Sequence, residues 1–146
     1  MPATDPSAYV DTSILVAALT GEPGTAAAQG WLAAQGKRTL AVSDWSLTEF
    51  SAALSLKLRR RELNASLRNE SLAKFSALVE ESLLVVAVEP LDFRAAAHLA
   101  DQHVTGLRAG DALHLAVASR HGMTVHTLDK GMVRAVELGI PTVLIA

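Results

Sequence analysis

The chain has 146 residues, of which 50% are hydrophobic and 19% are charged, and its formal net charge at pH 7 is −2. These proportions are typical of a globular protein, here a single domain over residues 1–146, and they exclude a disordered chain. The weak net charge excludes a strong overall attraction to nucleic acid or anionic lipid. Because the chain contains no cysteine, disulfides and thiolate metal sites are excluded as well.

The sequence predicts neither a membrane span nor a secretory signal. The apolar run at residues 83–88 is far shorter than the roughly 20 residues that a transmembrane helix needs. The N-terminal stretch MPATDPSAY has neither the basic region nor the apolar core of a signal peptide. We therefore expect a cytoplasmic protein.

Helix caps and turn residues divide the chain into alternating strands and helices. In chain order, the pattern predicts a strand at 8–12, helices at 13–19 and 25–35, a strand at 39–44, helices at 44–61 and 64–81, a strand at 83–88, helices at 90–104 and 109–122, a strand at 124–129, a short helix at 130–139 and a strand at 141–146. The run LLVVAV at 83–88 has no polar alternation, which is typical of a strand buried on both faces. This order predicts a three-layer α/β/α sandwich with a mostly parallel central sheet.

Four carboxylates stand where predicted strands end or on the helices that follow. Asp11 and Asp129 end strands, Asp111 opens a helix, and Glu49 lies on the flank of an apolar helix face. Because ligands of open α/β sheets bind beyond the carboxyl ends of the strands, we expect the four side chains at one edge. Taken singly, each could instead be a helix cap, a turn residue or a solvated side chain.

Clustered carboxylates repel one another unless a cation compensates them, and hard divalent cations prefer oxygen ligands. The five histidines show no metal-binding spacing. His114, one turn after Asp111, could line the same site, although we expect a packing role. The sequence contains no Gly-rich phosphate loop, serine nucleophile elbow or cysteine nucleophile. The residues therefore favour a metal-dependent hydrolase acting on a phosphodiester.

Basic residues are few and partly clustered. The segment KLRRR at 57–61 is either a solvated helix end or a phosphate-contacting patch. Arg108 and Lys130 stand beside the proposed acids in the sequence. The candidate RNA contacts are Lys57, Arg59, Arg60, Arg61, Arg108 and Lys130. The aromatic content of 4% excludes extensive base stacking.

Four segments, YVDTSILVAAL, SLTEFSAAL, LRAGDALHLAVA and TVHTLDKGM, resemble in order and spacing the PIN-domain ribonucleases, above all the VapC-type toxins of VapBC toxin–antitoxin pairs. The resemblance implies that Asp11, Glu49, Asp111 and Asp129 form a catalytic acidic quartet that binds Mg²⁺ or Mn²⁺. It implies that Ser13 orders the metal site or its water, and that Thr127 supports the fourth carboxylate. It also implies cleavage of single-stranded or loop RNA, a homodimer, and a VapB-like antitoxin whose C-terminal segment occludes the site.

Other interpretations stay open at this point. The chain could be an RNA-processing nuclease of the same fold without a toxin role. A receiver-like phosphoacceptor domain would also place carboxylates around Mg²⁺, but it needs an acidic pair where this chain has Asp11 alone. A binding module with structural acids is a further alternative. If the nuclease interpretation is right, Asp11→Asn should abolish cleavage with little loss of folding.

Overall fold

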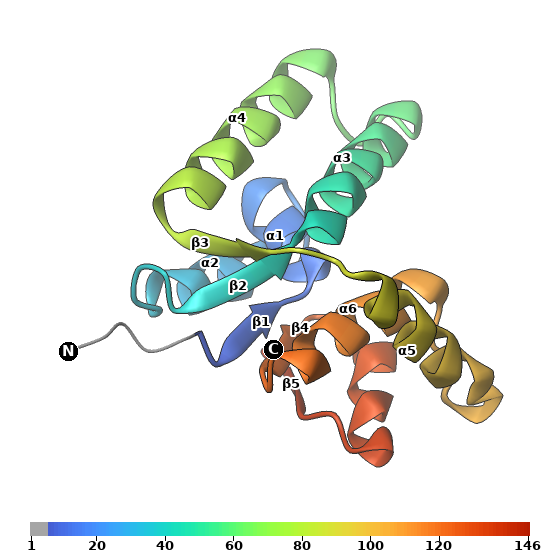
Figure 1. Ribbon diagram of the computed structural model, residues 1–146. Helices are drawn as coiled ribbons and strands as arrows, with labels where there is room; N and C mark the ends of the chain where they lie inside the picture. Colours follow the sequence, from blue (N-terminus) through green and yellow to red (C-terminus); the bar gives the residue numbers. More distant parts are fainter. Residues whose placement is uncertain (1–5) are drawn as a thin grey trace.

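A computed structural model describes residues 6–146. Residues 1–5 lie outside the described residues, and with them most of the N-terminal stretch for which no secretory signal is predicted. The elements in chain order are β1 (Ala8–Val10), α1 (Thr12–Leu19), α2 (Thr25–Ala33), β2 (Leu40–Ser43), α3 (Asp44–Arg59), α4 (Ala65–Glu81), β3 (Leu83–Val86), α5 (Pro90–Asp101), η1 (His103–Thr105), α6 (Ala109–Arg120), β4 (Thr124–Thr127), η2 (Lys130–Leu138) and β5 (Thr142–Leu144) (Figure 1). The predicted alternation of strands and helices is confirmed.

The five strands form one parallel sheet in the order β3-β2-β1-β4-β5. The chain winds outward from β1 to β3 on one side and then returns to β4 on the other. The strand order therefore reverses between β1 and β4, whose carboxyl ends lie side by side because Val10 pairs with His126. Ligands of open α/β sheets bind at such a switch point.

Two hydrophobic clusters cover the two faces of the sheet. Alternation along β1 sends Val10 into the cluster with α1, α3 and α4, and Tyr9 into the cluster with α6 and η2. Helix α6 is buried on all sides from Ala112 to Ala118, as expected of a helix enclosed between the sheet and a further helix. This arrangement confirms the predicted three-layer sandwich.

One prediction about the sheet is wrong. Strand β3 lies at the edge of the sheet, and Val85 is 38% exposed, so the strand is not buried on both faces. Its apolar run reflects packing of Leu83 against one hydrophobic cluster and of Val86 against the other, not a central position. The segment after α5 also differs from expectation, because residues 103–105 form the separate 3₁₀ helix η1.

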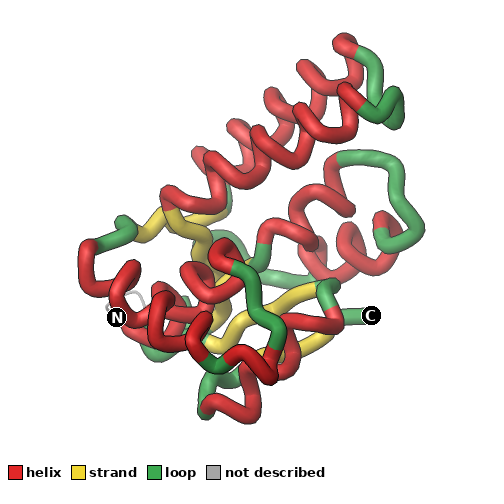
Figure 2. Tube along the Cα trace, turned by 90° about the vertical axis from the view of Figure 1, so that its right-hand side faces the viewer, coloured by secondary structure: helices red, strands yellow, loops and turns green. Residues whose placement is uncertain are grey.

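Helices α3 and α4 lie side by side and project beyond the sheet (Figures 1 and 2). The rings of Phe50 and Phe75 stack between them with centroids 4.1 Å apart. Asn64 caps α4, because its side chain accepts a hydrogen bond from the backbone N–H of Leu67 (2.8 Å). Within residues 6–146, none of the helices has the length and apolar character needed to cross a membrane.

Candidate metal centre

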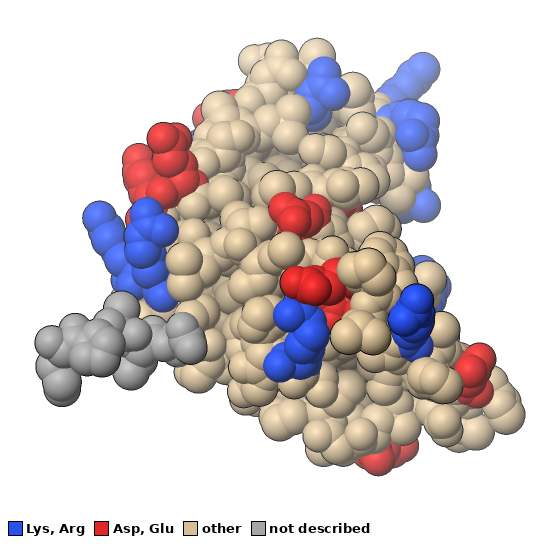
Figure 3. Space-filling view, viewed as in Figure 1, with Lys and Arg blue, Asp and Glu red and all other residues tan. Residues whose placement is uncertain are grey.

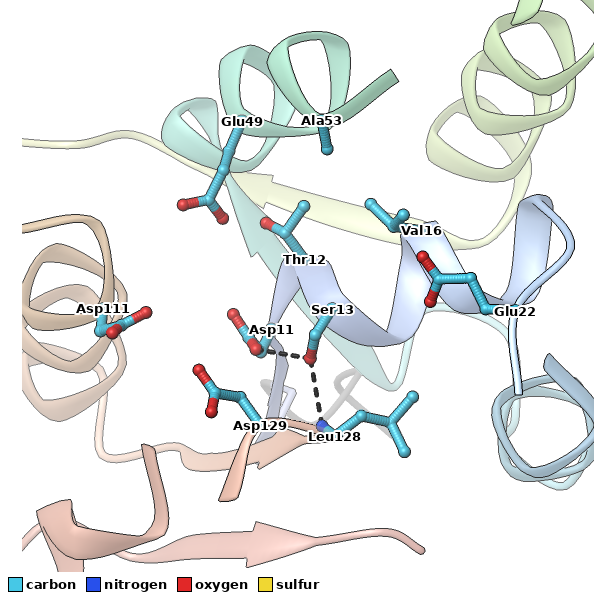
Figure 4. A pocket seen from close by; sticks show the side chains of 10 residues that line it. All are labelled: Asp11, Thr12, Ser13, Val16, Glu22, Glu49, Ala53, Asp111, Leu128 and Asp129. Carbon is cyan, nitrogen blue, oxygen red and sulfur yellow. Dashed lines mark hydrogen bonds between the residues drawn. The ribbon is translucent and has the colours of Figure 1, made fainter. Parts of the chain in front are cut away.

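A pocket of about 430 Å³ opens at the carboxyl ends of β1 and β4. Its lining residues are Asp11, Thr12, Ser13, Val16, Glu22, Glu49, Ala53, Asp111, Leu128 and Asp129. We call it the acidic pocket, because five of these residues carry carboxylates. Figure 4 shows the side chains of Asp11, Glu49, Asp111 and Asp129 pointing toward a common space. The structure thus brings together all four carboxylates that the sequence singled out.

Asp11 is held by hydroxyl groups and does not act as a helix cap. It occupies the N-cap position of α1, yet its side chain makes no capping hydrogen bond. Instead, Oδ2 accepts hydrogen bonds from Ser13 Oγ (2.6 Å) and Thr127 Oγ1 (2.7 Å). The side chain is almost fully buried, and these two bonds compensate part of the cost of burying its charge.

The same two hydroxyls tie β4 to the start of α1. Ser13 Oγ accepts a hydrogen bond from the backbone N–H of Leu128 (3.1 Å), and Thr127 Oγ1 accepts one from the backbone N–H of Asp129 (2.9 Å). Thr127, expected to support the fourth carboxylate, therefore touches the Asp129 backbone and the Asp11 carboxylate. Each hydroxyl orients one side chain and one backbone segment of the acidic pocket.

Asp111 and Asp129 face the acidic pocket and also bond to local backbone groups. Asp111 Oδ2 accepts from the backbone N–H of Arg108 (3.3 Å), and Asp129 Oδ1 accepts from that of Gly131 (2.9 Å). Asp111 thus bonds to the backbone at the start of α6 and Asp129 to the backbone of the following turn, while both side chains also line the acidic pocket. Burial raises the pKa of Asp111, and the nearby charges of the other carboxylates raise it further, against the smaller lowering by the Arg108 N–H.

Glu49 reaches the acidic pocket from α3 and is bonded to a histidine. Its Oε1 lies 2.7 Å from Nε2 of His114. Burial alone would raise the pKa of Glu49, but the hydrogen bond from His114, with smaller contributions from other neighbours, outweighs burial and lowers it. A Cβ atom at Gly110 would lie 2.8 Å from Glu49 Oε2, so the glycine leaves the space that this carboxylate occupies.

Sequence reasoning missed Glu22, the fifth carboxylate of the acidic pocket. The segment TGEPG at residues 20–24 carries no local signal that would place Glu22 near the site. In the structure, Lys57 Nζ lies 2.7 Å from Glu22 Oε1 and 3.6 Å from Glu62 Oε2. The ion pair compensates the charge of Glu22.

None of the six candidate RNA contacts is among the residues that line the acidic pocket in the described part of the chain. Arg59, Arg60 and Arg61 lie at the end of α3, roughly 15 Å along the helix from Glu49. Figure 3 shows positive side chains gathered over that end of the α3–α4 pair. Arg108 and Lys130 are exposed at the starts of α6 and η2, close to Asp111 and Asp129 in the chain.

The donor set fits a hard divalent cation. Carboxylate oxygens from separate segments converge in one water-accessible pocket. The raised pKa of Asp111 reflects its burial first and then the charges of the neighbouring carboxylates, which a cation would compensate. Mg²⁺ and Mn²⁺ prefer such oxygen ligands. Among the described residues, ligand atoms of Asp11, Glu49 and His114 also lie within 4.8 Å of one another.

A parallel sheet with an acidic pocket at its switch point is the architecture of several classes of metal-binding α/β proteins. The family model of the PIN domain matches residues 8–138, and the chain belongs to the PIN domain family. This match excludes the alternative that the chain is a receiver-like phosphoacceptor domain.

Solved structures share the fold at low sequence identity. The chain is similar to VapC20 of Mycobacterium tuberculosis, a sarcin–ricin loop cleaving toxin (TM-score 0.71, 20% identity, covering 88% of this chain and 95% of that one). It is also similar to a toxin–antitoxin complex from Klebsiella pneumoniae (TM-score 0.67, 18% identity, covering 96% of this chain and 98% of that one). A third similar structure is PAE2754 of Pyrobaculum aerophilum (TM-score 0.65, 24% identity, covering 90% of this chain and 85% of that one). No curated protein matches the sequence.

Proposed function

We propose that this chain is a divalent-metal-dependent endoribonuclease that cleaves single-stranded or loop RNA and acts as the toxin of a type II toxin–antitoxin pair. One observation carries the proposal. Asp11, Glu49, Asp111 and Asp129 come from four separate segments and point into one pocket at the switch point of the sheet. Like charges are gathered in this way at the expense of stability, which favours a functional reason for the cluster.

Each residue has a role in this proposal. The four carboxylates hold Mg²⁺ or Mn²⁺, and Ser13 and Thr127 fix Asp11 through their hydrogen bonds to Oδ2. When bound, the ion supplies Lewis-acid polarisation of a phosphodiester and lowers the pKa of attacking water. Asp129 is the most exposed carboxylate of the quartet. In this proposal, it is the carboxylate best placed to orient the attacking water.

RNA is the proposed substrate because of the family membership and the resemblance to VapC-type toxins. A phosphodiester chain needs cationic contacts outside an acidic site. Arg108 and Lys130 are exposed beside Asp111 and Asp129 and are the nearest candidates along the chain. Arg59, Arg60 and Arg61 would contact a more distant part of the substrate.

The proposed protein partner is an antitoxin of the VapB type. The acidic pocket has five carboxylates and, within residues 6–146, no basic residue in its lining. Its charge is therefore complementary to a basic side chain presented by a partner's C-terminal segment. The resemblance also implies a homodimer, which light scattering on the purified chain would measure.

The test is cleavage of a structured RNA pool by the purified chain with Mg²⁺, with Mn²⁺ and with a chelator. We expect metal-dependent cutting that leaves 5′-phosphates and that Asp111→Asn abolishes. Asp44→Asn is the matched control, because it removes an exposed carboxylate of α3 that does not line the acidic pocket. Absence of cutting by folded, antitoxin-free protein on all RNAs would contradict the proposal.

Expression in cells separates the toxin from an RNA-processing nuclease of the same fold. A toxin should arrest growth on induction, and co-expression of the neighbouring antitoxin gene should restore it. Cutting in vitro without growth arrest would instead support the processing role.

A further inference from the structure

A chain of buried hydrogen bonds leads from the interior of the sheet to Glu49. His114 lies on α6, one turn after Asp111, and its side chain is completely buried. Its Nδ1 lies 2.6 Å from the hydroxyl of Tyr9, and its Nε2 lies 2.7 Å from Oε1 of Glu49. Tyr9 is itself fully buried on β1, with its hydroxyl 2.8 Å from Ser43 Oγ. His114 thus has a polar partner at each ring nitrogen, which a packing histidine does not need.

The chemistry of the partners fixes the direction of these bonds. An ionised carboxylate can only accept hydrogen bonds, so Nε2 of His114 carries the proton that points to Glu49. With that proton on Nε2, a neutral ring leaves Nδ1 as an acceptor, and the Tyr9 hydroxyl 2.6 Å away donates to it. The hydroxyl of Ser43 can then donate to the Tyr9 oxygen. All donors consequently run in one direction, from Ser43 through Tyr9 and His114 to Glu49.

Glu49 needs such support because its own element does not orient it. It is a long side chain on a helix surface, and 28% of the side chain is exposed. Without a partner, its carboxylate would sample several rotamers. The bond from His114 fixes Oε1, and the space left by Gly110 admits Oε2, so one orientation toward Asp11 and Asp111 is selected.

We propose that His114, itself oriented by Tyr9, is a positioning residue that holds the Glu49 carboxylate in the geometry in which the acidic pocket binds its cation. The proposal rests on the proposed function in one respect, the assignment of Glu49 as a metal ligand. Partners that orient a ligand commonly change metal affinity by roughly 10- to 100-fold.

The competing role for His114 is that of a direct ligand. Its Nε2 lies 3.8 Å from Asp11 Oδ1, close enough for one ion to reach both atoms together with Glu49. A ligating nitrogen must, however, give up its proton and turn its lone pair to the ion. The two roles therefore predict opposite states of Nε2 when the cation is bound.

The first experiment is long-range ¹H–¹⁵N NMR of the histidine ring nitrogens in the full, metal-free chain. We expect His114 with a proton on Nε2 and none on Nδ1, and we expect Nε2 to keep its proton when Mg²⁺ is added. Glu49→Gln should shift the Nε2–H signal, while Asp129→Asn should leave it in place. A proton on Nδ1 alone, or loss of the Nε2 proton with Mg²⁺, would overturn the proposal.

The second experiment measures Mn²⁺ affinity by calorimetry in a mutant cycle. His114→Gln keeps a donor near the Nε2 position and should bind Mn²⁺ within about threefold of wild type, whereas His114→Leu should lose roughly tenfold or more. In a Glu49→Ala background, His114→Leu should cause no further loss of Mn²⁺ affinity. An equal loss in both backgrounds would show a general structural effect and contradict the positioning role.

Tyr9→Phe provides the variant that keeps the core volume if His114→Leu fails to fold. It removes only the hydroxyl that orients Nδ1, and we expect weaker Mn²⁺ binding together with a changed His114 ring spectrum; unchanged values of both would contradict the proposal. Neither experiment depends on RNA cleavage. Failure of the nuclease assay with the expected NMR result would therefore refute the proposed function while leaving the positioning role intact.

Discussion

The ammonium group of Lys57 lies 2.7 Å from Oε1 of Glu22, a carboxylate that lines the acidic pocket. The sequence suggests Lys57 as an RNA contact, but in the structure its side chain is only 14% exposed and lies between Glu22 and Glu62. The Lys57 ammonium group therefore compensates the charge of Glu22, the fifth carboxylate of the acidic pocket beside the four proposed metal ligands. Its effect on RNA would be indirect, through the potential of the acidic pocket.

Lys57→Met should lower kcat/KM for RNA by about three- to tenfold, because Glu22 becomes an uncompensated charge at the acidic pocket. Adding Glu22→Gln in the same chain should restore most of the loss. Steady-state kinetics on one RNA substrate at low ionic strength measures both variants. Lys74→Met is the control, since Lys74 pairs with Glu70 on the exposed surface of α4. A loss that Glu22→Gln fails to restore would indicate a direct phosphate contact by Lys57.

Asp111→Asn should abolish cleavage and at the same time stabilise the metal-free protein. The raised pKa of Asp111 means that the folded state binds its proton more tightly than the unfolded state. The ionised Asp111 side chain therefore destabilises the folded protein. This destabilisation is absent below the pKa of Asp111 in the unfolded chain, near about 3.9, and it develops as pH rises through the pKa in the folded protein. Urea unfolding in chelator should show equal stability of the two proteins at low pH and a more stable variant at neutral pH.

Mg²⁺ reverses this order if the carboxylates bind it. Ligand binding to the folded state adds stability to wild type, and the Asn variant should gain much less. Asp44→Asn should respond to Mg²⁺ as wild type does. An Asp111→Asn protein that is less stable than wild type in chelator at neutral pH would refute the destabilisation inferred from the raised pKa of Asp111.

The positions of the quartet could be predicted because hydrophobic patterning marks the ends of strands. Asp11 directly follows β1 and Asp129 lies two residues after β4, and the ends of parallel strands meet at one edge. What the pattern does not encode is the order of strands across the sheet. For that reason the pattern predicts a β3 buried on both faces, whereas β3 lies at the edge of the sheet.

The partners of the supporting residues could not be predicted from the pattern, because they are distant in the chain. His114 bonds to Tyr9 across 105 positions and to Glu49 across 65. Lys57 and Glu22 pair only because α3 packs against α1. Thr127 supports Asp11 across the β1–β4 pairing, which requires knowledge of the switch point.

Arg120 should be the most important single cation for stability. Its Nε and Nη2 bond to Asp92 Oδ1 (2.7 Å) and Oδ2 (2.9 Å), and Asp92 is 1% exposed. Arg120→Ala leaves this carboxylate buried without its cation, and we expect a loss of about 3 kcal/mol in the free energy of unfolding. Arg94→Ala, an exposed change on the same α5–α6 pair, should alter it by less than about 0.5 kcal/mol. A similar loss for both variants would contradict this assignment.

The Asp92–Arg120 pair also predicts a pH dependence. Burial raises the pKa of Asp92, but the bonds from Arg120 and the backbone N–H of Glu89 outweigh burial and lower it. Because its pKa is lowered, ionised Asp92 stabilises the folded protein. This stabilisation is complete above the pKa of Asp92 in the unfolded chain, near about 3.9, and it is lost as pH falls through the pKa in the folded protein. Urea unfolding between neutral and acidic pH should therefore show the difference between wild type and Arg120→Ala shrinking as the solution is acidified.

Thr127→Val separates orientation of Asp11 from the packing of β4. The change removes the donor to Asp11 Oδ2 and leaves the backbone N–H of Asp129 without its acceptor. We expect a loss of about 1–3 kcal/mol in the free energy of unfolding and a roughly 10- to 100-fold fall in kcat.

Thr142→Val on the neighbouring strand β5 is the matched control for that prediction. Thr142 is also buried, but its hydroxyl donates only to the Ile140 carbonyl (3.1 Å), and it does not line the acidic pocket. The control should lose some stability and keep its kcat, as measured by urea unfolding and single-turnover cleavage. If both threonine variants lost kcat in proportion to stability, the hydroxyl of Thr127 would have no specific role. A fall in kcat confined to Thr127→Val would show that Asp11 must be held at Oδ2 for the acidic pocket to act.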